Sequence, residues 1–265
     1  MNPSVILALL TRYVLLYTRN PVRLFELFFW PIVQLLMWGF VTGYLQQQGD
    51  GDFSKTISFL IGAIILWDAL FRSQQGVAIS FLEDVWTRNL LNVFAAPVRM
   101  TEYLAATFSV GFLRVIITSL VLALIAWTGY AFNLFQFQGW LIPYYANLMI
   151  FGWSLGILST AMVLRWGHGA ESLAWAIPFM VQPVAAVFYP VSSLPAWLQP
   201  IALALPPSHV FEGMRAAVAG KDALWSPMIT AFSLNLVYLA AAGAVFALTM
   251  RSARRKGLLV KVTSS

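Results

Sequence analysis

The chain has 265 residues, of which 60% are hydrophobic and only 10% are charged, and its net charge is +6. Soluble domains carry about 25% charged residues, so this composition excludes a water-soluble protein and predicts an integral membrane protein. The sequence contains no cysteine, which excludes disulfides and thiolate metal sites.

Residues 1–20 have the pattern of an amphipathic helix. Ser4, Thr11 and Thr18 recur every seven residues, and most of the remaining positions are aliphatic or aromatic. This pattern predicts a helix that lies in the membrane interface and ends at Asn20-Pro21; a frayed start of the first membrane span is the alternative. The stretch lacks a basic region before its apolar run, so we do not expect a cleaved signal peptide.

Six apolar stretches have about the 20 residues that a helix needs to cross a bilayer. They are 25–45, 57–80, 103–127, 140–164, 173–189 and 228–250. With the N-terminus inside, most arginines and lysines lie on the cytoplasmic side, as the positive-inside rule requires. We therefore predict one all-α, multi-pass domain over 1–265 in a plasma membrane, in bacteria the inner membrane. Both termini, and the basic tail 251–265, would be cytoplasmic.

The second predicted span carries ionisable residues at mid-membrane depth. Asp68, Arg72 and Gln75 are spaced i, i+4 and i+7 on one helical face, and Arg114 in the third span is a further cation. Charged residues at this depth cost about 3 kcal/mol each on insertion scales, so they are functional candidates. Two interpretations stay open: residues of a transport path, or a self-neutralising group in the bundle interior. Both predict that this face points away from lipid.

The connection between the second and third spans, 83–102, reads EDVWTRNLLNVFAAPVRMTE. Its pattern predicts a cytoplasmic amphipathic helix over 83–96 that Pro97 ends. Such a helix either rests on lipid or fits the groove of a soluble partner, and its two acids favour the partner because an anionic leaflet repels them. The candidate partner contacts are Asp84, Trp86, Arg88, Asn89, Leu90 and Asn92.

Residues 188–220, between the last two spans, contain prolines at 190, 195, 200, 206 and 207. The prolines leave pieces of about ten residues, and a helix of that length covers about 15 Å, half of the hydrocarbon core. We therefore predict a re-entrant helical hairpin near the outer face; a loop lying wholly outside is the alternative. Its candidate gate residues are Tyr189, Trp197, Pro206, Glu212 and Arg215.

The sequence shows no motif of a nucleotide-binding, metal-binding or catalytic site. It contains no phosphate-binding loop, so we do not expect the chain to bind or hydrolyse ATP. On the predicted topology His168 and His209 lie on opposite sides of the membrane and cannot share a metal ion. We expect no catalytic residues, no cofactor or metal in this chain, and no nucleic-acid partner.

Two of these stretches resemble the type-2 ABC exporter permease family. FLEDVWTRNLLNVFAAPVRMTEYLAAT, residues 81–107, is similar to the family's coupling-helix loop with its small-Pro-Val turn. FYPVSSLPAWLQPIALALPPSHVFEGMRAA, residues 188–217, is similar to the family's outer re-entrant helices. One departure lies at 87–91, where many members have Gly-Thr-Leu-Glu and this chain has Thr-Arg-Asn-Leu-Leu.

The resemblance implies the membrane subunit of an ATP-driven exporter. It implies a homodimer in the lipid bilayer, with a separate ATPase subunit beneath each copy that binds the ATP and Mg, and alternating access at the dimer interface. Transported substrates in such a family range over glycans, lipids and drugs. The rivals are a secondary transporter or channel, which predicts interrupted spans in both halves of the chain, and a membrane-embedded enzyme, which requires converging polar groups.

Overall fold

The computed structural model describes residues 1–48, 54–220 and 225–255, and every regular element in these ranges is helical. The all-α prediction is therefore confirmed. The longer helices are α1 (Pro3–Thr18), α2 (Pro21–Gln48), α3 (Ser54–Trp86), α5 (Met100–Tyr130), α6 (Leu141–Trp166) and α10 (Trp225–Arg255). The shorter ones are α4 (Leu90–Ala95), α7 (Glu171–Val184), α8 (Gln199–Leu203) and α9 (Pro206–Val218), with 3-10 turns η1 (Leu134–Trp140), η2 (Gly167–Ala170) and η3 (Val191–Ser193).

Five helices in the described part of the chain, α2, α3, α5, α6 and α10, are long and apolar enough to cross a membrane. They cover five of the six predicted spans. At the sixth predicted span, 173–189, the structure has a shorter helix, α7, which contains 14 residues and ends at Val184. At 1.5 Å per residue it is about 21 Å long, whereas the hydrocarbon core is about 30 Å thick. Pro178 and Pro183 lie inside α7, and each removes one backbone hydrogen bond from the helix.

Helices α3 and α6 form the centre of the bundle. In their most apolar stretches 83% and 78% of the residues are buried, against 22% for α2 and α10. Glycines allow the close packing on α3. A Cβ atom added at Gly76 would lie 2.5 Å from the backbone nitrogen of Gly111 on α5, and one at Gly152 of α6 would lie 2.5 Å from the oxygen of Leu70. Small residues at such crossings let helix backbones approach closely in membranes.

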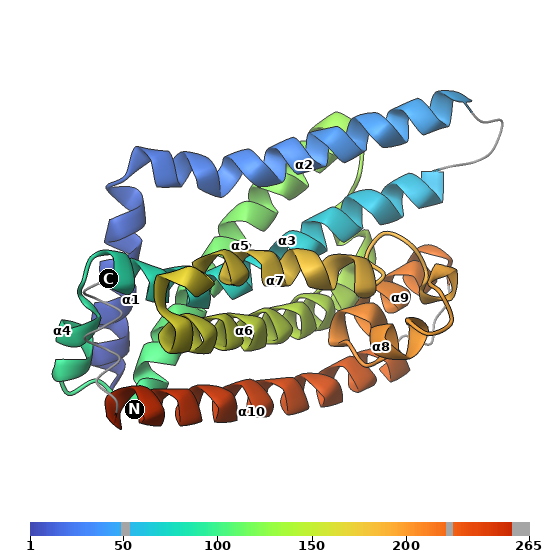
Figure 1. The fold of residues 1–265 in the computed structure, drawn as a ribbon. Coiled ribbons are helices and arrows are strands. Elements are labelled where there is room, and N and C mark those ends of the chain that lie inside the picture. Colours follow the sequence, from blue (N-terminus) through green and yellow to red (C-terminus); the bar gives the residue numbers. More distant parts are fainter. Residues whose placement is uncertain (49–53, 221–224, 256–265) are drawn as a thin grey trace.

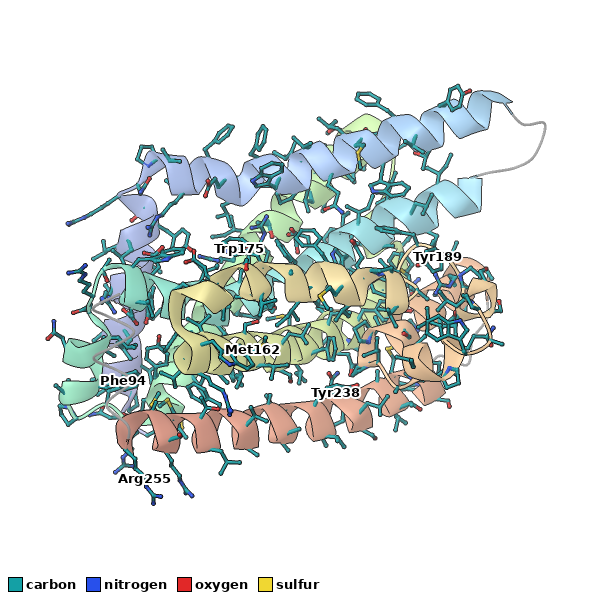
Figure 2. The ribbon with its side chains drawn as sticks, viewed as in Figure 1. Phe94, Met162, Trp175, Tyr189, Tyr238 and Arg255 are labelled. Carbon is teal, nitrogen blue, oxygen red and sulfur yellow. The ribbon has the colours of Figure 1, made fainter. Side chains whose placement is uncertain are left out.

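The bundle has two distinct ends (Figure 1). The N-terminus, α4 and the end of α10 lie at one end, while α8 and α9 lie at the other. Figure 2 shows the same separation, with Phe94 and Arg255 at the first end and Tyr189 at the second. Helix α1 crosses the first end instead of running along the bundle. We call these the α4 end and the α9 end.

The predicted hairpin contains two short helices, α8 and α9, as the prolines indicated. Pro206 and Pro207 occupy the first turn of α9, where a missing amide costs no hydrogen bond. Of the predicted tail 251–265, the residues 256–265 lie outside the described part of the chain.

Candidate functional site

A cavity of about 770 Å³ lies between α2, α3 and α7. Its volume falls in the range of about 300–1,000 Å³ that is typical of ligand pockets. Aromatic and aliphatic side chains from all three helices form most of its walls, and Figure 2 marks Trp175 on the α7 wall. The main apolar lining residues are Trp30, Met37, Trp67, Phe71, Trp175 and Phe179.

The polar stripe predicted on the second span lines this cavity. The Nε atom of Arg72 lies 3.2 Å from Oδ1 of Asp68, and its Nη1 atom donates a 3.0 Å hydrogen bond to Oε1 of Gln75. The three residues are buried, since no more than 6% of any of them is exposed. Asp68 and Arg72 thus neutralise each other and also face the cavity, so the two interpretations of the stripe are compatible.

Arg114 of α5 lines the same cavity, and no carboxylate in the described part of the chain pairs with it. It is 6% exposed, and its guanidinium lies 3.9 Å from the centre of the Tyr17 ring of α1. Among the described residues, no acceptor binds its Nε and Nη2 atoms. The stripe and Arg114 therefore differ. Arg72 binds Asp68 and Gln75, whereas Arg114 is stacked on an aromatic ring and two of its donors have no acceptor within residues 1–48, 54–220 and 225–255.

The last turn of α3 makes polar contacts with α2 and α7, which form two walls of the cavity. Glu83 forms a 2.6 Å ion pair with Arg23 of α2. Trp86 donates a 3.1 Å hydrogen bond from Nε1 to Oε2 of Glu171, the first residue of α7. Because the two residues belong to one helical turn, a tilt of this turn would displace α2 and α7 together.

Asp84, between these two residues in sequence, binds α1. Its Oδ1 atom pairs with Arg12 at 2.5 Å, and its Oδ2 atom accepts hydrogen bonds from the hydroxyls of Tyr13 at 2.7 Å and of Tyr103 at 3.0 Å. Asp84, Tyr13 and Tyr103 are all 0% exposed. Burial and the neighbouring carboxylate raise the pKa of Tyr13 well above its usual value, so this hydroxyl stays a donor at neutral pH.

The predicted single helix over 83–96 needs correction. Helix α3 continues to Trp86, and α4 begins only at Leu90. Between them the chain forms a Schellman motif, in which Asn89 donates its N–H to the Asp84 carbonyl at 2.8 Å and Arg88 donates to Val85 at 3.0 Å. Arg88 takes the left-handed conformation, with φ of 53°, which glycine normally supplies. The sequence pattern missed this break because no glycine marks it.

The break divides the predicted partner contacts into two groups. Asp84 and Leu90 are 0% exposed and point into the protein, so they are not part of the outer surface of the described chain. Arg88 and Asn92 are exposed, Asn89 is half-buried, and Trp86 is 40% exposed. Leu90 and Val93 pack α4 onto its own chain. A polar surface therefore remains for contact with a soluble partner.

A glutamine on α3 forms hydrogen bonds that support α7, the cavity wall that contains two prolines. Gln74 donates hydrogen bonds from Nε2 to the Ala174 carbonyl at 2.9 Å and to the Ser159 hydroxyl at 3.2 Å. In a regular helix the Ala174 carbonyl would bind the amide of residue 178, but that residue is Pro178 and has no N–H. Gln74 thus replaces a missing bond and joins α7 to the bundle centre.

The candidate gate residues lie at the α9 end. Glu212 accepts a 2.7 Å hydrogen bond from the Val191 amide, and Arg215 donates from Nη2 to the Ala186 carbonyl at 2.9 Å and to Glu212 at 3.2 Å. Ala186 has a left-handed backbone with φ of 50°. Glu212 and Arg215 therefore stabilise the turn that follows α7. The Tyr189 hydroxyl donates to the Pro183 carbonyl at 2.6 Å, whereas Trp197 is 72% exposed.

A family model described as ABC-2 type transporter matches residues 4–219. The chain belongs to this family. A search of curated proteins gives no match. The matched region runs from α1 to α9 and contains the cavity, α4 and the hairpin. ABC-2 membrane subunits are the permease part of ABC transporters and work with separate ABC ATPase subunits. The chain is therefore the transmembrane subunit of an ABC transporter, as the resemblance indicated.

Sequence reasoning missed several residues of the site in this ABC-2 subunit. Glu83, Arg23 and Glu171 fix the cavity walls, and Gln74 supports α7, yet none was singled out. One signal was present: two adjacent acids, Glu83 and Asp84, follow a span, and the N-terminal region supplies Arg12 and Arg23. Charge complementarity could have suggested these pairs, although nothing local shows which acid binds which arginine.

Proposed function

We propose that the chain exports an amphipathic or bulky substrate from the cytoplasm by alternating access, as a homodimer with one ATPase subunit beneath each copy. The observation that carries this proposal is the last turn of α3, where Glu83, Asp84 and Trp86 bind α2, α1 and α7 respectively. The exposed surface of α4 follows directly after this turn. A soluble motor at α4 is thus connected to both cavity walls by short polar contacts.

The proposed mechanism is a rigid transfer of movement. Leu90 and Val93 are the buried side of α4 and pack against the rest of the protein, so a shift of α4 must also move the residues that it contacts. A force on α4 would tilt the end of α3, and Glu83 and Trp86 would carry α2 and α7 with it. Packed interfaces of this kind switch between discrete arrangements instead of deforming continuously. The cavity would open toward the two ends of the bundle in alternation.

Charge supports a cytoplasmic α4 end, in the inner membrane of a bacterium. The arginines at that end are numerous, and the positive-inside rule places such clusters in the cytoplasm. Arg12, Arg19, Arg23, Arg88, Arg99 and Arg165 belong to this group. On this orientation both described chain ends are cytoplasmic and the hairpin α8–α9 is outside. Exposed apolar side chains beside the cavity, including Phe40 on α2 and Met180 on α7, offer a surface for the second copy.

The test measures the separation of the two walls and needs no known substrate. The chain has no cysteine, so spin labels can be placed at Met37→Cys and Phe179→Cys, both more than half exposed. Dilution of the labelled chain with unlabelled chain limits the signal to the distance between α2 and α7 of one copy. We expect ATP and vanadate to change this distance in the complex with the ATPase subunit. Glu83→Gln combined with Trp86→Phe should abolish the change while the subunits stay associated and hydrolyse ATP.

Two results would contradict the proposal. In one, the wall distance is the same with and without ATP in an intact complex. In the other, an ion gradient moves the walls without the ATPase subunit, as expected of a secondary transporter. A labelled pair away from the two walls, at Leu120→Cys on α5 and Leu236→Cys on α10, serves as the matched control, because both residues are exposed and their separation should stay constant.

A further inference from the structure

The guanidinium of Arg114 is a buried donor that this chain leaves incompletely bonded. It is 6% exposed, lines the cavity and stacks on Tyr17 at 3.9 Å. Stacking occupies the flat face of a guanidinium and leaves the N–H groups at its edge. Two of these edge atoms, Nε and Nη2, have no acceptor among the described residues. Buried polar groups are nearly always hydrogen-bonded, so this side chain indicates a ligand.

Three arginines and three acids line the cavity, and their pairing leaves Arg114 without a partner among the described residues. Arg72 pairs with Asp68, and Arg23 pairs with Glu83. The remaining acid that lines the cavity, Glu26, is exposed and lies on α2 one turn from Arg23. Thus Arg114 is the lining cation without an ion-pair partner in the described part of the chain, and an anion would neutralise it.

The cavity walls indicate the chemistry of the rest of the ligand. Trp30, Trp67, Phe71 and Phe179 surround the polar stripe with aromatic surface, and the cavity of about 770 Å³ has room for a drug-sized molecule or one chain of a larger one. The unpartnered Oδ2 atom of Asp68 adds a buried acceptor that suits a hydroxyl. The site therefore matches an apolar molecule that carries an anion and a hydroxyl group.

We propose that Arg114 binds the phosphate or carboxylate of an anionic amphiphile whose apolar part lies against the aromatic walls. A guanidinium edge fits either anion through two parallel hydrogen bonds. We assign this amphiphile as the transported substrate, a step that rests on the proposed export function. The binding itself does not depend on that function.

Equilibrium binding to the full chain tests the site. The chain is placed in nanodiscs of zwitterionic phosphatidylcholine. The probes are 1-oleoyl lysophosphatidic acid and 1-oleoylglycerol, which has the same acyl chain and 2-hydroxyl group but a second hydroxyl in place of the phosphate. We expect wild type to bind the phosphate probe at least tenfold tighter. Arg114→Gln should bring the two affinities within twofold, and Arg114→Lys should retain part of the preference. Arg165→Gln, an exposed arginine with the same charge change, should behave as wild type.

Equal affinity of wild type for both probes, or a phosphate preference that survives in Arg114→Gln, would overturn the anion site. The fold of Arg114→Gln is checked by its melting temperature, which should not fall, because the change removes a buried charge that has no carboxylate partner.

The complex with the ATPase subunit then separates substrate from resident membrane lipid. A transported substrate should raise ATP hydrolysis in wild type and in Arg165→Gln but not in Arg114→Gln. If ATP moves the spin-labelled walls while the bound phosphate probe leaves hydrolysis unchanged, the ligand is a resident lipid and the substrate assignment is overturned. If ATP does not move the walls, the export function fails, and the binding data still decide the anion site.

Discussion

Glu83 at the end of α3 and Arg23 at the start of α2 form an ion pair of 2.6 Å, and Glu83 is nearly fully buried. The residues beside Glu83 make equally specific contacts with other helices: Asp84 with α1, and Trp86 with α7. Four helices thus meet at one turn that is only 3 residues, Thr87 to Asn89, away from α4. The arrangement gives each residue of this turn a separate, testable role.

Asp84→Ala should destabilise the α4 end. The change leaves the buried hydroxyls of Tyr13 and Tyr103 without their acceptor and removes the partner of Arg12. An unsatisfied buried donor costs about 1–3 kcal/mol, so we expect the free energy of unfolding to fall by about 2 kcal/mol or more. Thermal denaturation in detergent measures the loss. Adding Tyr13→Phe and Tyr103→Phe should recover part of it; a triple variant less stable than Asp84→Ala alone would contradict this explanation.

Arg88 allows charge and backbone effects to be separated. Arg88→Gly should raise the free energy of unfolding by about 1 kcal/mol relative to Arg88→Ala, because only glycine takes a positive φ without a steric cost. Both variants remove the guanidinium, so both should weaken binding of the ATPase subunit to a similar extent, as measured by titration. If Arg88→Gly binds the subunit as wild type does while Arg88→Ala fails, the backbone and not the charge makes the contact.

Gln74 and Pro178 form a pair suited to a double-mutant cycle. Gln74→Leu leaves the Ala174 carbonyl without its donor, and we expect a loss of about 1–3 kcal/mol. Pro178→Ala restores an amide that can bind the same carbonyl. The loss caused by Gln74→Leu should therefore be smaller in the Pro178→Ala background. Equal losses in both backgrounds would show that the glutamine does not replace the missing helical bond.

Gly76 and Gly129 test the packing of α3 against α5. A Cβ atom at Gly76 would meet the Gly111 backbone, whereas one at Gly129 meets nothing within 4 Å. Gly76→Ala should thus lower the free energy of unfolding by about 1–3 kcal/mol through overpacking. Gly129→Ala should raise it by about 0.5–1 kcal/mol, because alanine favours the helix. Opposite signs in thermal denaturation are the expected result, and a stabilised Gly76→Ala variant would refute the close crossing.

Arg72→Met should leave the buried carboxylate of Asp68 without its ion-pair partner. Breaking a buried pair by removing one partner costs about 3–5 kcal/mol in soluble cores. We expect the free energy of unfolding to fall by a similar amount, which lowers the folding yield and the melting temperature. Asp68→Asn in the same chain should restore most of the stability. Gln75→Ala, which removes one hydrogen bond from Arg72, is the milder control. A double variant as unstable as Arg72→Met would argue against the ion pair.

Much of the architecture could be predicted from local sequence. The apolar stretches indicated the long helices, the seven-residue spacing indicated α1, and the prolines indicated that 188–220 would break into short helices. These features depend on hydrophobic length and backbone chemistry, which act within a few residues. The burial of Asp68, Arg72 and Gln75 followed for the same reason, since charged groups on a spanning helix must turn away from lipid.

The end of the second span was predicted less well. Amphipathic spacing over 83–96 suggested one continuous surface helix, but Arg88 adopts a left-handed conformation that its residue type does not signal. The last turn of α3 then faces the protein instead of the solvent. Asp84, expected at a partner interface, is buried against Tyr13 and Tyr103.

The sequence alone determined that this chain is a helical membrane protein with a polar stripe, an amphipathic N-terminal helix and a segment broken by prolines, because each property is encoded within one helix length. Only the tertiary structure decided that Glu83 pairs with Arg23 and that Gln74 donates to the carbonyl that Pro178 leaves without a helical partner. It also decided that Arg114 lies in a cavity where no described residue accepts two of its hydrogen bonds. These partners come from different helices. Their pairing depends on how whole helices cross, and those crossings are set by close contacts such as Gly76 on Gly111, which no local pattern specifies.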